Sequence, residues 1–127
     1  MSRDLYIIVK EEDVRIVAED TIGNLALKAR SVLKEIEKIR QGSEHLDVNS
    51  SYELHPQMSF FPPSKNLKVW VCGGMKYACC SLQLYNLRKA GYNADYHPNA
   101  CLDFLARLVE PQRLPGFSQL VPEYYVH

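Results

Sequence analysis

The sequence predicts an α/β (or α+β) fold with a small mixed sheet, a βαβ unit in the C-terminal half and a long amphipathic helix in the N-terminal half. Three observations predict it. Apolar side chains recur every three or four residues from 22 to 39, which is the period of one helix face. Residues 5–9 and 67–71 are short runs rich in β-branched and aromatic side chains, as in buried strands. From 67 to 96 the pattern is strand, helix, strand within about 30 residues, which fits one βαβ unit.

Length, charge and hydropathy limit the class of protein. The 127 residues suit a single domain with one core. Fifteen Lys and Arg balance fifteen Asp and Glu, and this zero net charge makes nucleic acid an unlikely partner, although it leaves RNA open. No apolar run reaches the roughly 18 residues of a membrane span, and the N-terminal apolar stretch is too short for a signal peptide. We therefore expect a cytoplasmic protein with no membrane contact.

In the N-terminal half, residues 14–18 (VRIVA) predict either a second strand or an extension of the first. The helix from 22 to 39 follows, with Asp20 or Thr21 able to cap its start and Gly42 able to end it. Its aliphatic stripe has two interpretations. It covers a sheet of the same chain, or it pairs with a helix of a partner.

Two segments are predicted to be irregular within one domain that spans residues 1–127. Residues 43–66 carry Ser, Asn and Pro with no helical period, which indicates a long connector. Residues 110–127 contain three prolines, which indicate an irregular C-terminal tail.

The C-terminal half is predicted to hold two helices and a strand besides the strand at 67–71. Residues 75–90 have apolar side chains along one helix face. Residues 92–96 then form a strand that Pro98 ends, and Asn99 caps a further helix that runs to about Val109.

The turn after the strand at 67–71 is the first candidate site. It places Gly73, Gly74, Met75 and Lys76 between the carboxyl end of a strand and the start of a helix, where open α/β sheets bind ligands. Free N–H groups at a helix start attract anions, so these four residues are candidate ligands of a nucleotide-like molecule. Neither GxGxxG nor GxxxxGK[ST] is present, and a turn with a positive φ explains the two glycines equally well.

A second candidate site is catalytic and consists of Cys72, His97 and Asp95. A helix start lowers a thiol pKa, and His97 ends the neighbouring strand, where it could act as the base. The alternative is that Cys72 fills the core and His97 ends a strand at the surface. Cys79 and Cys80 are neighbours that point about 100° apart on a helix, and no metal-ligand spacing occurs, so we expect no metal and no cofactor.

Residues 67–98 resemble the anticodon-binding domain of class II aminoacyl-tRNA synthetases. The resemblance rests on a strand, a helix ending in Leu87–Arg88, the pair Ala90–Gly91, and a strand finishing near Asp95, and it covers about a quarter of the chain. It implies an α/β fold that binds RNA or, in degenerate relatives, mediates the dimerisation of regulatory proteins. The N-terminal half has no counterpart in that family, and no functional residue is carried over.

Three functions from different classes follow from these observations. The leading interpretation is a non-enzymatic binding and oligomerisation module that acts through a protein partner, with a homo-oligomer expected. One alternative is a nucleotide-like small-ligand binder that uses the Gly73–Gly74 turn, and another is a Cys-dependent enzyme that uses Cys72 and His97. A cleft beside Gly73 would favour the second, and contact between Cys72 and His97 would favour the third.

Overall fold

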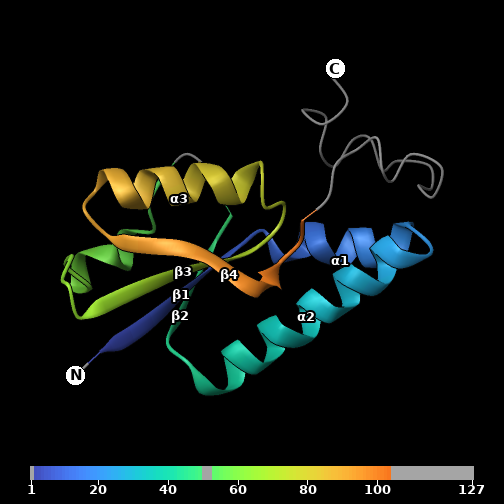
Figure 1. The fold of residues 1–127 in the computed structure, drawn as a ribbon, viewed down its shortest axis with the longest axis horizontal. Helices are drawn as coiled ribbons and strands as arrows, with labels where there is room; N and C mark the ends of the chain where they lie inside the picture. Colours follow the sequence, from blue (N-terminus) through green and yellow to red (C-terminus); the bar gives the residue numbers. More distant parts are fainter. Residues whose placement is uncertain (1, 50–52, 104–127) are drawn as a thin grey trace.

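The computed structural model of the chain describes residues 2–49 and 53–103 (Figure 1). Within these residues four strands alternate with three α-helices and one short 3-10 helix. In chain order they are β1 (Arg3–Val9), α1 (Glu11–Asp20), α2 (Asn24–Gly42), β2 (His45–Val48), η1 (Pro56–Phe60), β3 (Leu67–Gly73), α3 (Cys79–Lys89) and β4 (Asn93–Cys101).

The four strands form one sheet in the order β2-β1-β3-β4, and all three pairings are parallel. The α/β class, the long amphipathic helix and the βαβ unit, which is β3-α3-β4, are therefore confirmed. The sheet differs from the mixed sheet that we expected, because each connection between paired strands is long enough to return the chain to the same edge of the sheet.

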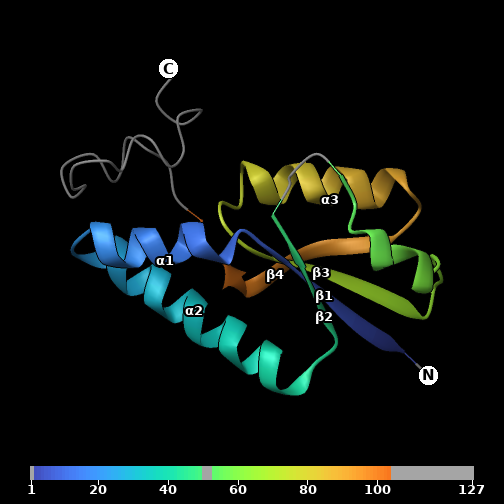
Figure 2. The same cartoon turned by 180° about the vertical axis from the view of Figure 1, so that it is seen from behind.

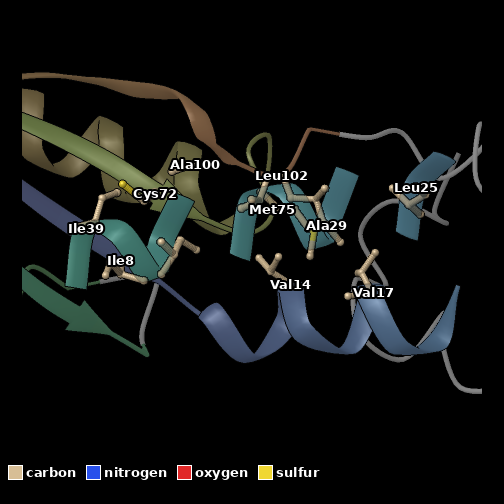
Figure 3. Close-up of a cluster of buried hydrophobic side chains, with 14 residues drawn as sticks. Ile8, Val14, Val17, Leu25, Ala29, Ile39, Cys72, Met75, Ala100 and Leu102 are labelled. Atoms are coloured by element: carbon tan, nitrogen blue, oxygen red, sulfur yellow. The ribbon is translucent and has the colours of Figure 1, made fainter. Parts of the chain in front are cut away.

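The helices cover both faces of the sheet, with α3 on one side and α1 and α2 on the other (Figures 1 and 2). One core cluster lies between the sheet and α1 and α2, where Ile8, Cys72 and Met75 meet the apolar stripe of α2 (Figure 3). The second cluster lies under α3 and η1, and there Leu5, Val69 and Leu87 are fully buried. The aliphatic stripe of α2 thus covers a sheet of its own chain.

Residues 14–18, for which the sequence predicts a strand, are helical and belong to α1. Val14, Val17 and Ala18 are buried at spacings of three and four, which is the helical period. The acidic side chains of residues 11–13 lie in the first turn of this helix, where the helix dipole favours negative charge. The prediction of a strand is therefore wrong.

Two further predictions are corrected. The stretch 43–66 is not irregular throughout, because it contains β2, which pairs with β1, and η1, whose Met58 is buried. β4 does not stop before Pro98 but runs to Cys101, so Asn99 lies in a strand and caps no helix. An edge strand tolerates proline at an irregular position of its ladder. The rest of that expected helix, to Val109, and the tail at 110–127 lie outside the described residues.

Candidate functional site

Three aromatic rings from three adjacent strands meet on the α2 side of the sheet. Tyr6 of β1 is the register partner of Trp70 of β3, and His97 comes from β4. The His97 ring centroid lies 5.9 Å from that of Tyr6 and 5.9 Å from that of Trp70. All three side chains are half-buried in the described part of the chain. We call Tyr6, Trp70 and His97 the aromatic cluster.

Charged and polar side chains surround the aromatic cluster. The indole N–H of Trp70 donates to the Asp4 carboxylate at 3.2 Å. The Lys68 ammonium lies 5.0 Å from the centre of the Trp70 ring and donates to the Asp95 carboxylate. Arg88 donates to the other oxygen of Asp95 at 2.6 Å, and these two cations hold the pKa of Asp95 below its ordinary value, with Lys68 as the larger cause.

The two faces of the sheet differ at this end. On the α3 side the corresponding positions are Leu5, Leu67 and Val69, and all are buried. On the α2 side no described helix lies over the amino-terminal ends of β1 and β3 (Figure 1). Parallel sheets usually carry helices on both faces, so packing inside the described chain does not account for this open half-face.

β4 bulges next to the aromatic cluster and borders a cavity. Val71 pairs with Tyr96 and Gly73 pairs with Cys101, so residues 97–100 of β4 stand opposite Cys72 alone. A cavity of about 370 Å³ lies between this bulge and α2. Its lining residues are Lys28, Ser31, Val32, Glu35, Pro98, Asn99, Cys101, Leu102 and Asp103. Bulges are common beside binding sites because they redirect side chains.

The surroundings of His97 shift its pKa. Burial lowers the pKa of His97 below its ordinary value, and the negative charge of Glu35, which lines the cavity, opposes that shift. The backbone N–H of Asn99 donates to Nδ1 of His97 at 3.1 Å. His97 therefore favours its neutral form, with Nδ1 occupied as an acceptor.

The glycine pair after β3 is required by close approach to the neighbouring elements. Gly73 has φ +108°, and a Cβ on it would lie 1.9 Å from the carbonyl oxygen of Val9. A Cβ on Gly74 would lie 2.8 Å from Cγ2 of Val14 in α1. β3 can thus pair with β1 at Val9 only with glycine at position 73, and a side chain at position 74 would displace Val14.

Several amides of this turn are engaged within the chain. The N–H of Gly74 donates to the Val9 carbonyl, and the N–H of Lys76 donates to the Leu102 carbonyl. α3 begins at Cys79 and not at Met75, which is fully buried in the core. The cavity described above is not lined by residues 73–76. Binding of a nucleotide-like ligand at Gly73, Gly74, Met75 and Lys76 remains a prediction.

Lys76 is the charged member of this turn. Its ammonium lies 5.2 Å from the ring centres of both Tyr77 and Tyr96 and 3.9 Å from the Asp103 carboxylate. The charge is thus shared between two aromatic faces and one carboxylate, which is an arrangement suited to holding the turn against the end of β4.

The three residues of the catalytic hypothesis have other partners. Cys72 is fully buried, its Sγ lies 3.9 Å from the Trp70 carbonyl oxygen, and burial raises its pKa well above the ordinary value. Asp95 is bound to Lys68 and Arg88, and Nδ1 of His97 is bound to Asn99. An enzyme nucleophile needs a lowered pKa and a hydrogen-bonded base, and these contacts supply neither. Catalysis by Cys72, His97 and Asp95 remains a prediction.

Comparison of the chain with protein-family models, curated proteins and solved structures finds no match. The resemblance of residues 67–98 to an anticodon-binding domain therefore remains a prediction. Among the described residues no helix is long and apolar enough to cross a membrane. In the same residues no group of three or more His, Cys, Asp and Glu side chains is arranged to hold a metal ion.

The sequence-based reasoning found His97 and Asp95 but missed Tyr6 and Trp70. Both missed residues lie inside short apolar runs that were interpreted as buried strands. Lys68 was the available signal. It lies two residues before Trp70 and so shares its face of the strand, and its charge indicates that this face reaches solvent.

Proposed function

We propose that this protein is a non-enzymatic binding module that self-associates through the open half of its sheet, with Trp70 at the centre of the contact. The observation that carries the proposal is the half-buried aromatic cluster at the end of α2, on a parallel sheet face whose amino-terminal strand ends no described helix covers (Figure 1). Burial of these rings against a partner would complete the covering that a parallel sheet normally has.

The composition of the face supports a protein contact. Trp and Tyr are the residues that most often dominate binding energy when they lie at the centre of an interface. Here the two lie side by side, and Asp4, Lys68 and Asp95 form a polar rim around them. An apolar centre within a polar rim is the usual arrangement of a protein–protein interface.

The charges on the face favour a second copy over nucleic acid. The rim carries both signs, since Lys68 lies between Asp4 and Asp95. In a two-fold contact the same patch meets itself, so a patch with both signs can pair its own acids with its own base. A phosphate backbone would instead meet two carboxylates, and a surface that binds it needs a cationic excess.

Trp70 is the single tryptophan of the chain, so its fluorescence reports directly on the proposed contact. We expect analytical ultracentrifugation to show a dimer that dissociates on dilution. The Trp70 emission should move to shorter wavelength as the dimer forms, because the indole leaves water. A monomer mass at every concentration, with a constant emission maximum, would contradict the proposal.

Trp70→Ala and Tyr85→Ala form a matched pair of variants. Each removes an aromatic side chain, but Tyr85 is 62% exposed and lies on α3, on the other side of the sheet. We expect Trp70→Ala to weaken self-association at least about tenfold and Tyr85→Ala to leave it unchanged. Circular dichroism would confirm that both variants fold. Equal effects of the two substitutions would place the contact elsewhere.

A further inference from the structure

Two of the four cysteines meet under the start of α3. Cys80 is fully buried in the core cluster between α3 and the sheet, and the half-buried Cys101 packs against the same cluster from the end of β4. The Cys101 thiol donates to the carbonyl oxygen of Val71 at 2.9 Å. The Cys80 Sγ lies 3.7 Å from the carbonyl oxygen of Cys72, which is the next residue of β3. The two sulfur atoms thus approach the carbonyl oxygens of two consecutive residues of β3.

The thiols of Cys80 and Cys101 are neighbours at this cluster. Burial is the largest cause that raises the pKa of Cys80, and the neighbouring Cys101 thiol raises it further. A buried thiol with a raised pKa stays protonated, so Cys80 by itself is a poor nucleophile. Cys101 is partly exposed, so a small solute can reach it.

The other two cysteines are placed differently. Cys72 belongs to the core cluster on the α1 and α2 side of the sheet (Figure 3). Cys80 belongs to the cluster on the α3 side, so the sheet separates the two side chains. Cys79 precedes Cys80 on α3, and neighbouring side chains on a helix point about 100° apart. Cys79 is therefore a natural control for Cys80, because it has the same chemistry one position away.

We propose that Cys80 and Cys101 are a redox-active thiol pair that peroxide converts into a reversible disulfide within one chain. The Cys101 thiol loses its proton and its sulfur attacks hydrogen peroxide. The O–O bond breaks, the leaving hydroxide takes up that proton as water, and Cys101 becomes a sulfenic acid. The Cys80 sulfur then attacks the Cys101 sulfur, the S–O bond breaks, and a second water leaves. Two thiols and one peroxide thus give one disulfide and two waters, and an added dithiol reverses the reaction.

This assignment goes beyond the proposed self-association and is independent of it, because the pair lies on the α3 side of the sheet and the aromatic cluster lies on the other. The disulfide would join the first turn of α3 to the end of β4 and so close the β3-α3-β4 unit covalently. A crosslink of this kind restricts the unfolded chain, so oxidation should raise the melting temperature, and a reducing dithiol should lower it again.

The test treats the full chain with hydrogen peroxide and measures its intact mass under non-reducing conditions. We expect the wild type and Cys79→Ser to lose the mass of two hydrogens, with recovery after dithiol treatment. Cys80→Ser and Cys101→Ser should not lose it. Cys80→Ser should instead gain oxygen at Cys101, because no second thiol captures the sulfenic acid.

Cys101→Ser changes only a half-buried side chain and so keeps the test valid should the buried Cys80→Ser variant fail to fold. Loss of two hydrogens in the Cys101→Ser variant would overturn the assignment. So would a wild-type chain that only gains oxygen, or a disulfide that fragmentation of its tryptic peptides assigns to Cys72 or Cys79.

Discussion

Gly73 pairs with Val9 at the end of β3, and both its backbone conformation and its surroundings require glycine. Its φ of +108° disfavours any side chain, and a Cβ would collide with the Val9 carbonyl at 1.9 Å. We expect Gly73→Ala to lower the free energy of unfolding by about 2 kcal/mol or more, measured by urea denaturation. Gly42→Ala is the control, because nothing lies within 4 Å of that Cβ, and it should change little. Similar losses in both variants would contradict this account.

His97 should make the stability of the protein depend on pH. Because burial lowers its pKa from the ordinary 6.5, the unfolded chain binds a proton at a higher pH than the folded chain. Stability is therefore full above the unfolded pKa and falls as pH drops from 6.5 through the lower folded pKa. The lowered pKa of Asp95 acts in a separate window, below its ordinary 3.8.

Denaturant unfolding at about pH 7.5 and about pH 5 tests this expectation. The wild type should be less stable at the lower pH, and His97→Gln should reduce the difference between the two values. A difference of the same size in wild type and variant would assign the pH dependence to other groups.

Arg40 joins three elements at the end of α2. It donates to both carboxylate oxygens of Asp47 in β2 and, at 2.8 Å, to Glu11 of α1, and both carboxylates help raise its pKa. Its side chain is 31% exposed, so solvent screens the pairs only in part. We expect Arg40→Ala to lower the free energy of unfolding by about 1–2 kcal/mol.

Lys38→Ala is the matched control for Arg40, because Lys38 pairs with Glu35 on the same helix and is 74% exposed. It should cost less than about 0.5 kcal/mol. Thermal or urea unfolding of the two variants makes the comparison, and an equal loss in both would show that Arg40 holds the elements together no better than a surface pair.

The elements that the sequence predicted correctly are those with a long or unambiguous period. α2 presents its period over five turns, and β1 and β3 are compact apolar runs. Residues 14–18 were misassigned because five residues with three β-branched side chains fit a strand as well as a helix. The acidic residues 11–13 favour a helix, since negative side chains stabilise its first turn. β2 was missed because its four residues provide only two buried side chains.

The candidate site depends on strand register, which sequence patterns do not fix. Tyr6 and Trp70 are 64 positions apart in the chain, and only the pairing of β1 with β3 brings them together. The bulge at 97–100, which places His97 beside them, arises from the register shift between Val71 and Gly73. The glycine turn was predictable because a local demand on φ is visible in the sequence, whereas a surface assembled from three strands is not.

At the scale of the whole molecule, zero net charge removes the long-range repulsion that would oppose self-association. The proposed contact then has two components, the aromatic centre and the charged rim of Asp4, Lys68 and Asp95. The dependence of the dimer dissociation constant on salt distinguishes their contributions. Between 0.1 M and 1 M salt the screening length falls from about 10 Å to about 3 Å, which weakens exposed ion pairs and leaves apolar burial intact.

We expect the dimer dissociation constant, measured from the concentration dependence of Trp70 emission, to change less than about threefold across this range, because the aromatic centre should dominate. Lys68→Ala should likewise have a smaller effect than Trp70→Ala, since Lys68 already pairs with Asp95 of its own chain. A tenfold weakening in high salt, together with a large effect of Lys68→Ala, would mean that the rim holds the two copies together. The open half-face would then be an electrostatic contact surface, and Trp70 only its boundary.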